Sequence, residues 1–531
     1  MPRPALRRRR GGAALAAIAL AVTACSSDSG VRTEDAERAD APSAPPGEPS
    51  PRSTTGDDAS DDTTSSDAPD SASGSDEAVG EIDWERFDDQ LDTAQLDVPI
   101  DYDDPSGGSF ELFLVRHRAA DEDAKIGSLL INPGGPGSGG ADYAAGAEFI
   151  FGDEILERFD IIGWDPRGTG YTDPAIDCID DYDEYFAGVD ITPDDDDERQ
   201  RLIDEARDLT EQCTTRNADI FQHVGTNDSA RDIDSIRRAL GEDTISYFGF
   251  SYGSELGATW ATLFPDTVRA AVLDGAVDPT ADSGEGELQQ ALGFEEAITS
   301  YLAQCSADPE CAFHNGGDAE GAYDALMAEL DEDPIPTEPG RPDLTLSMAT
   351  QGVIQAMYDD SAWNQLSEAL AAAQAGDGEG LLQLYDTYYR RNPDGTWANL
   401  LEAFLVISCA DQAERPTVEE SDALAQVIHE AAPRRAPGTT GEYGCTFFPP
   451  SESPRIDITG AGAGPIVVIG TTGDAATPLA STRVMADTLE DGRLVVVTAD
   501  KHTGYGENDC VDTVVHRYLV DLEVPPDETN C

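Results

Sequence analysis

The chain has 531 residues and a formal net charge of −73 at pH 7, because 106 acidic side chains outnumber 33 lysines and arginines. So little positive charge cannot neutralise the phosphates of a nucleic acid, and nucleic-acid binding is excluded as a main role. The acidic excess is interpreted chiefly as a solvated surface that keeps the protein soluble.

The first residues have the features of an export signal. Four arginines at residues 7–10 precede an apolar stretch at residues 13–22, which is too short to span a membrane. The sequence Val-Thr-Ala-Cys at residues 22–25 is similar to a lipobox, which predicts a lipoprotein signal peptide over residues 1–24 and lipidation of Cys25. A plain secretion signal is the alternative. Either one predicts an extracytoplasmic protein, lipid-anchored to the cell membrane or secreted.

Residues 25–80 are rich in Ser, Asp, Thr, Pro, Ala and Gly and contain almost no large apolar side chain. Such a segment cannot bury enough surface to offset the entropy of ordering it. We therefore predict a disordered acidic tether that holds the folded part away from the membrane.

A glycine-rich loop, residues 132–140, follows an expected buried strand at residues 127–131. Its glycines allow positive φ angles and leave N–H groups uncovered, as a site for an oxyanion requires. A phosphate-binding loop would need Gly-Lys-Ser/Thr, which is missing, and a flexible linker would not follow a buried strand. We expect the N–H of Gly135 to be one oxyanion donor. After the next strand, residues 159–162, Arg167 is expected to tie loops together.

Residues 249–253, Gly-Phe-Ser-Tyr-Gly, lie between an expected strand at residues 244–248 and an expected helix. A Gly-x-Ser-x-Gly between strand and helix is the pattern of a nucleophile elbow. The serine hydroxyl then projects from the top of the sheet, and the next N–H points at a developing oxyanion. Ser251 is therefore the candidate nucleophile, and Tyr252 joins Gly135 as a candidate oxyanion donor.

Beyond Asp274 the strand signals become sparse until about residue 442. Residues 280–442 show helical spacing of Leu, Ala, Met and Tyr, which predicts a helical cap between two parts of a core, residues 81–279 and 443–531. The expected cap helices span residues 285–304, 321–330, 347–359, 362–375, 378–391 and 400–407.

The base and the acid are sought among residues that follow strands. Of six histidines, only His502 stands in a glycine-containing loop after a strong strand, residues 493–498. Asp474 follows the buried strand at residues 465–470, so both side chains lie at the ends of neighbouring parallel strands. The order Ser, Asp, His is that of α/β hydrolases. Asp274, at the end of another strand, remains the main alternative acid.

Eight cysteines remain when Cys25 is set aside. An even number in an exported chain suggests disulfides, and neighbours in the sequence suggest Cys178–Cys213, Cys305–Cys311, Cys409–Cys445 and Cys510–Cys531. The cysteine and histidine spacings do not fit zinc ligation, and no metal or other cofactor is expected.

Five motifs in order resemble the secreted tripeptidyl-aminopeptidase-like serine hydrolases, which are relatives of prolyl iminopeptidases. They are Asn-Pro-Gly-Gly-Pro-Gly, Trp-Asp-Pro-Arg-Gly-Thr-Gly, Gly-Phe-Ser-Tyr-Gly, Gly-Asp…Thr-Pro and Lys-His-Thr-Gly-Tyr-Gly. The resemblance covers residues 84–531. It implies an α/β-hydrolase fold, with a mostly parallel central sheet flanked by helices and an inserted helical cap. It also implies a serine exopeptidase that acts on free peptide N-termini through Ser251, Asp474 and His502.

Two other functions stay open. A carboxylesterase would use the same triad and the same acyl-enzyme, and a surface lipoprotein could keep the fold for binding alone. An aminopeptidase must also bind the substrate ammonium, for which buried carboxylates are the physical means. The cap offers many carboxylates and none is singled out: Glu285, Glu287, Glu295, Glu296 and Glu402.

Overall fold

The computed structural model describes residues 80–531, except 184, 186–189, 194, 436 and 438–442. The expected signal peptide, the lipidation site Cys25 and nearly all of the expected tether therefore lie outside the described residues. Among those described, no helix has both the length and the apolar composition needed to cross a membrane.

A ten-stranded sheet forms the core, in the order β1-β2-β3-β5-β4-β6-β7-β8-β9-β10. The pairs β1-β2, β2-β3 and β3-β5 are antiparallel, and all pairs from β5-β4 to β9-β10 along this order are parallel. The strands are Glu85–Arg86, Leu91–Pro99, Ser109–His117, Gly127–Asn132, Phe159–Trp164, Ile245–Phe250, Val268–Asp274, Ile466–Thr471, Gly492–Val497 and Glu528–Asn530.

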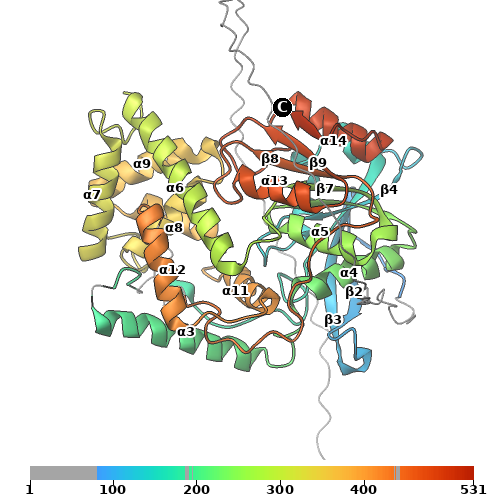
Figure 1. Ribbon diagram of the computed structural model, residues 1–531, viewed down its shortest axis with the longest axis horizontal. Helices are drawn as coiled ribbons and strands as arrows, with labels where there is room; N and C mark the ends of the chain where they lie inside the picture. The colour runs from blue at the N-terminus through green and yellow to red at the C-terminus, as the bar shows by residue number, and fades with distance from the viewer. Residues whose placement is uncertain (1–79, 184, 186–189, 194, 436, 438–442) are drawn as a thin grey trace, which may run out of the picture. The chain divides into compact units, whose positions relative to one another are not determined.

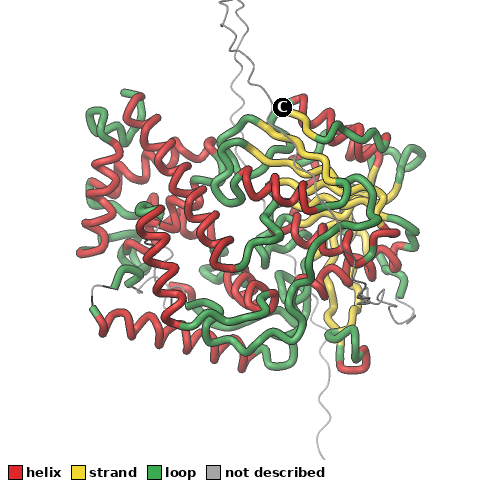
Figure 2. The backbone as a smooth tube through the Cα atoms, in the orientation of Figure 1, coloured by secondary structure: helices red, strands yellow, loops and turns green. Residues whose placement is uncertain are grey.

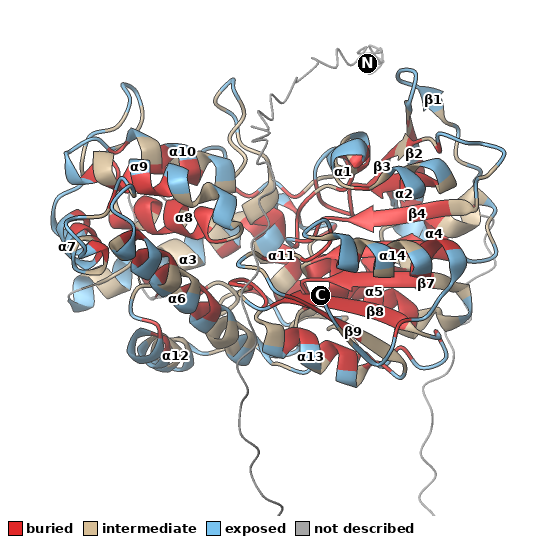
Figure 3. Cartoon of the chain, turned by 90° about the horizontal axis from the view of Figure 1, so that it is seen from above, coloured by how far each residue is buried: buried red, intermediate tan, exposed pale blue. Residues whose placement is uncertain are grey.

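The parallel strands are apolar on both faces because helices cover both. Strands β5, β6 and β8 are buried at every position, and β4 and β7 over most of their length (Figure 3). Side chains alternate between two apolar clusters: Leu130 of β4 belongs to one, and its neighbours Leu129 and Ile131 to the other. The mostly parallel sheet flanked by helices that the resemblance implied is confirmed.

Six α-helices of the described chain accompany the sheet. They are α1 (Ala141–Ala145), α2 (Asp153–Arg158), α4 (Thr226–Leu240), α5 (Tyr252–Leu263), α13 (Leu479–Thr488) and α14 (Asp509–Asp521). Helix α3 (Asp196–Arg216) precedes α4 in the chain but lies beside the helices between β7 and β8 (Figure 1). Helix α13 connects β8 to its parallel neighbour β9 and packs on both. Helix α5 follows β6 directly and is buried along nearly its whole length (Figure 1).

Between β7 and β8 the described chain is helical, and these helices lie beside the strands (Figure 2). They are α6 (Ser283–Ala307), α7 (Ala319–Glu332), α8 (Leu346–Ala356), α9 (Trp363–Gln374), α10 (Glu379–Tyr388), α11 (Leu400–Asp411) and α12 (Val418–Ala431). The expected helices correspond to α6 through α11, whereas α12 was not expected. Residues of α6 to α10 share an apolar cluster, which Ala475 and Ala476 of the loop after β8 also join.

Side-chain caps fix where several of these helices begin. Helices α6 and α12 each begin with a capping box, Asp282 with Glu285 and Thr417 with Glu420. The box places Glu285 at the start of α6, where its carboxylate is used by the helix itself.

Four disulfides join the cysteines of the described chain: Cys178–Cys213, Cys305–Cys311, Cys409–Cys445 and Cys510–Cys531. These are the pairs that sequence neighbours suggested. Disulfides persist in oxidising compartments, so they indicate an extracytoplasmic location.

Candidate active site

Ser251 occupies a sharp turn between β6 and α5. Its φ of 55° and ψ of −127° are unusual for a residue with a side chain and mark a strained backbone. Strand and helix approach so closely that a Cβ at Gly249 would lie 2.1 Å from the Gly253 carbonyl oxygen. The Ser251 N–H donates to the Asp274 carbonyl at 2.8 Å, which ties the turn to the end of β7. The serine therefore has the backbone geometry of a nucleophile elbow.

His502 and Asp474 form a buried pair. Nδ1 of His502 lies 2.9 Å from Oδ1 and 3.1 Å from Oδ2 of Asp474. The carboxylate also accepts hydrogen bonds from the backbone N–H groups of Ala476 at 3.0 Å and Thr477 at 2.8 Å, which hold it in place. Nε2 of His502 is buried without a hydrogen-bond partner among the described residues, so it is available for a proton.

The surroundings of His502 favour its charged form. Burial lowers the pKa of the imidazole, but the charge and hydrogen bond of Asp474, together with the charge of Asp274, outweigh burial, and the pKa is raised. An imidazolium that forms during a reaction is therefore stabilised by the adjacent carboxylate.

The backbone brings His502 to the same edge of the sheet as Ser251. Its N–H donates to the Tyr358 carbonyl at 2.9 Å, and its ring meets the Tyr358 ring edge-on at 5.4 Å. A Cβ at Gly275, the residue after Asp274, would lie 3.1 Å from Cε1 of His502. The Asp274 carbonyl accepts the Ser251 N–H, so the histidine and the nucleophile elbow both lie at the end of β7.

Asp274 contacts the loop after His502. Its carboxylate accepts the N–H groups of Gly504 and Tyr505, each at 2.8 Å, and has no hydrogen bond to His502. Burial raises the pKa of Asp274 to about 6. The structure thus brings Asp474 to the imidazole and gives Asp274 the task of shaping the loop that carries it.

The glycine-rich loop lies against the elbow. Gly134 and Gly135 have φ angles of 95° and 111°, and a Cβ at Gly134 would lie 2.8 Å from Cβ of Ser251. Tyr252 is the first residue of α5, where backbone N–H groups lack partners within the helix. The two expected oxyanion donors therefore lie on segments that flank the serine.

The Tyr252 side chain is held by a polar contact that the sequence did not suggest. Its hydroxyl lies 2.5 Å from Oγ1 of Thr226, which donates to the buried carboxylate of Asp411 at 2.6 Å. Burial raises the pKa of Asp411 to about 7. Asp411 ends α11, so this contact links the elbow to a cap helix.

Arg167 ties loops together, as expected. Its guanidinium pairs with Asp232 at 2.6 Å, and both side chains are fully buried. It also donates to the carbonyls of Ile100 at 3.0 Å and His223 at 2.8 Å. The residue therefore joins four segments of the core.

Two of the cap carboxylates that had been considered for a substrate ammonium are engaged within the fold. Glu402 is buried and accepts the Cys178 N–H at 2.5 Å, and burial raises its pKa to about 7. Glu295 accepts the N–H groups of Arg434 at 2.8 Å and Arg435 at 3.2 Å. Both carboxylates thus fix backbone segments.

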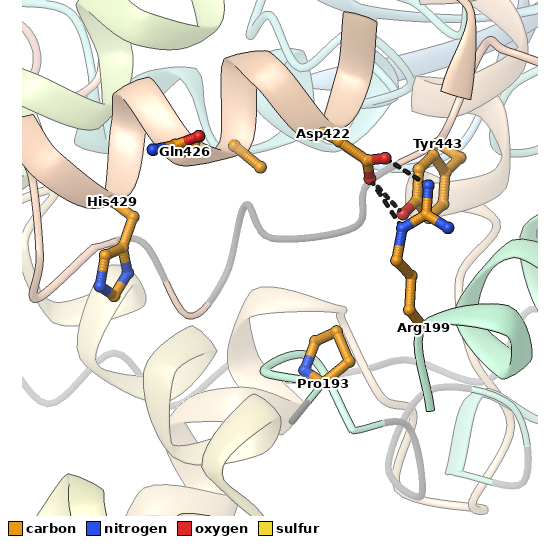
Figure 4. Close-up of a pocket in the computed structure, with 7 residues that line it drawn as sticks. Pro193, Arg199, Asp422, Gln426, His429 and Tyr443 are labelled. Carbon is orange, nitrogen blue, oxygen red and sulfur yellow. Dashed lines mark hydrogen bonds and ion pairs between the residues drawn. The ribbon is translucent and has the colours of Figure 1, made fainter. Parts of the chain in front are cut away.

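A pocket of about 410 Å³ lies between α3 and α12, away from these residues (Figure 4). Tyr443 donates to Asp422 at 2.8 Å, and Asp422 also pairs with Arg199. The pocket contains neither a candidate nucleophile nor its base, so the chemistry is assigned to the sheet edge. It is lined by Pro193, Arg199, Asp422, Ala425, Gln426, His429 and Tyr443.

Two family descriptions match the chain: the alpha/beta hydrolase fold over residues 127–315 and the TAP-like protein over residues 436–531. Serine protease Hip1 and carboxylesterase B of Mycobacterium tuberculosis are each 36% identical over 458 residues, covering 82% of this chain and 86% of each relative. Tripeptidyl aminopeptidase of Streptomyces lividans is 27% identical over 474 residues, covering 85% and 86%. The chain belongs to the tripeptidyl-aminopeptidase-like family of serine hydrolases with the α/β-hydrolase fold.

Proposed function

We propose that this protein is an exported serine aminopeptidase that releases di- or tripeptides from free peptide N-termini. The observation that carries the proposal is the buried pair of Asp474 and His502, at the sheet edge where Ser251 occupies its strained turn. The relatives named serine protease and tripeptidyl aminopeptidase support a peptidase.

In the proposed reaction Ser251 Oγ attacks the scissile carbonyl and His502 Nε2 takes its proton. Asp474 orients the imidazole and stabilises its charged form. The oxyanion binds the N–H groups of Gly135 and Tyr252. His502 then protonates the leaving amine, and a water molecule activated by the same nitrogen hydrolyses the acyl-enzyme. These steps use three side chains and two backbone N–H groups of this chain, together with one water molecule.

We assign the chemistry to the core, residues 81–279 and 443–531, and substrate selection to the cap, residues 280–442. Contacts between the two support this division. A Cβ at Gly137 in the glycine-rich loop would lie 2.6 Å from the Leu400 carbonyl of α11. The cap thus packs directly on the loop that we expect to bind the oxyanion.

Carboxylesterase activity is the second candidate. A relative named carboxylesterase B has the same identity to this chain, 36% over 458 residues, as the relative named serine protease. The same serine, histidine and aspartate would form an acyl-enzyme from an ester.

We also propose that the protein is a lipoprotein, with a signal peptide over residues 1–24 and a lipid on Cys25. The support is the arginine-rich start, the short apolar stretch and the lipobox-like residues 22–25. Detergent partitioning of the wild type and Cys25→Ser from the native host tests it. The wild type is expected in the detergent phase, and equal partitioning of both proteins into the aqueous phase would exclude the anchor.

Matched peptide anilides test the proposed activity. One set has free N-termini and the other has acetylated N-termini, with simple esters as a third set and Ser251→Ala as the blank. Strong preference for the free amine establishes an aminopeptidase. Turnover of esters without peptide cleavage establishes the esterase, and no turnover of any set favours the non-catalytic alternative.

A further inference from the structure

Arg435 is a buried cation without a counter-charge. The residue is 8% exposed, and its Nε and Nη1 atoms are buried with no hydrogen-bond partner among the described residues. It forms no ion pair with the residues that the structure describes. Its neighbour Arg434 differs, because it pairs with Asp324 at 2.9 Å. In a chain with 106 acidic residues, an unpaired buried arginine is exceptional.

Aromatic contacts place Arg435 close to the candidate base. Its guanidinium carbon lies 5.8 Å from the ring centre of Phe294 in α6. The Phe294 ring meets Tyr358 edge-on at 5.6 Å, and Tyr358 meets His502 at 5.4 Å. Burial raises the pKa of the Tyr358 phenol well above its usual value, and the charge of Arg435 partly offsets this. Two aromatic rings therefore separate the cation from the imidazole.

The contacts of Arg435 within the fold do not compensate its charge. The Glu295 carboxylate accepts the backbone N–H of Arg435 at 3.2 Å, which fixes the main chain and leaves the guanidinium unpaired. The contact with the Phe294 ring recovers less free energy than burying an isolated guanidinium costs. A buried guanidinium that the fold leaves without hydrogen-bond partners at two nitrogens, two aromatic rings from the candidate base, indicates that a ligand supplies its partner.

We propose that Arg435 binds a carboxylate group of the substrate. A planar guanidinium donates two parallel hydrogen bonds to a carboxylate, a pairing that a point charge does not match. In the peptides of the proposed function, the carboxylate belongs either to an Asp or Glu side chain or to the C-terminus of a short peptide. The inference rests on that proposed function only for the peptide nature of the substrate.

Three pairs of substrates test the inference and separate the sources of the carboxylate. The first pair differs in Glu or Gln within otherwise identical tripeptide anilides, and the second in a free or amidated C-terminus of a short peptide. The third pair is the 4-nitrophenyl monoester of adipic acid and its methyl ester. Because a charge-assisted hydrogen bond contributes about 1.5 kcal/mol or more, the wild type should prefer one carboxylate member by about 10-fold or more in kcat/KM.

The variants Arg435→Gln and Arg435→Lys are compared with the matched control Arg434→Gln. Arg435→Gln should lose the preference for the carboxylate member and keep its rate on the neutral member. Arg435→Lys should keep part of the preference, and Arg434→Gln should keep all of the preference. Because the glutamine variant loses an unpaired buried charge, its Tm should not fall. No preference in any pair, or an equal loss of rate on both members, would overturn the inference. If the protein cleaves the adipate esters but no peptide, the proposed function is contradicted. The adipate pair still tests the role of Arg435 in that case.

Discussion

Replacement of Asp474 by asparagine tests how the imidazole is held. Both carboxylate oxygens of Asp474 contact His502 Nδ1, at 2.9 and 3.1 Å, and Oδ1 also accepts two backbone N–H groups. Asparagine keeps one acceptor oxygen for the backbone and places an NH₂ group where the second oxygen stood. The imidazole then loses its counter-charge, and the NH₂ group near Nδ1 disfavours the tautomer that carries a proton on that nitrogen.

The size of the effect follows from these contacts. A hydrogen bond to a charged group contributes about 1.5–3 kcal/mol, and loss of the tautomer adds to this. We expect kcat to fall by about 10³–10⁴-fold, which is about 4–5.5 kcal/mol of transition-state stabilisation.

The pH dependence supplies a second measure. Burial lowers the pKa of His502, and the Asp474 charge and hydrogen bond, together with the Asp274 charge, outweigh it in the wild type. Without the Asp474 charge the pKa must fall. Since the base acts in its neutral form, activity is lost as the pH falls through this pKa, and the acid limb of kcat/KM should move to lower pH in Asp474→Asn.

The assay is the pH profile of kcat/KM for a peptide anilide or an ester that the wild type hydrolyses. Asp500→Asn, an exposed aspartate close to His502 in the sequence, is the matched control. If Asp474→Asn stays within about tenfold of the wild type, Asp474 is not the triad acid, because loss of a triad acid should cost more. The same conclusion follows if Asp274→Asn, and not Asp474→Asn, moves the acid limb.

Three further changes test other contacts. Gly135→Ala adds a Cβ 2.9 Å from the Gly137 nitrogen at a φ of 111°, so steady-state kinetics should show kcat lower by about 10²–10³-fold; a change in KM alone would contradict an oxyanion role. Arg167→Met leaves Asp232 buried and unpaired, so urea unfolding should show a loss of about 3–5 kcal/mol; an unchanged midpoint would refute this. Because burial raises the pKa of Asp411 from 3.8 to about 7, the unfolded state releases this proton first, and stability should fall as pH rises across that window. In Asp411→Asn the stability should depend less on pH across this window. Equal pH dependence of stability in the variant and the wild type would contradict the raised pKa of Asp411.

Local patterns made the elbow predictable from the sequence. The Gly-Phe-Ser-Tyr-Gly motif fixes a close approach of strand and helix within five residues, and the strands around it are continuous apolar runs. The structure places the turn at Ser251 with the positive φ that such a turn needs.

The choice between two acids could not be made from the sequence. Asp274 ends β7 and Asp474 follows β8, its neighbour in the sheet, so both are candidates by position. Only side-chain direction separates them, and direction depends on which loop N–H groups each carboxylate meets.

Two features escaped the sequence because they depend on tertiary packing. Helix α12 buries only Ile428, so its apolar periodicity is weak. Arg435 looks like any surface arginine in the sequence, and its burial arises where segments after α8 and α12 meet α6.

Labelling by a fluorophosphonate shows whether Ser251 is an activated nucleophile, because the reagent reacts with an activated serine whatever the substrate. Peptide mass mapping then locates the adduct. We expect one adduct, on Ser251, that is absent from Ser251→Ala and forms far more slowly in His502→Gln. No adduct, or an adduct on another serine, would contradict the assignment of Ser251 as the nucleophile.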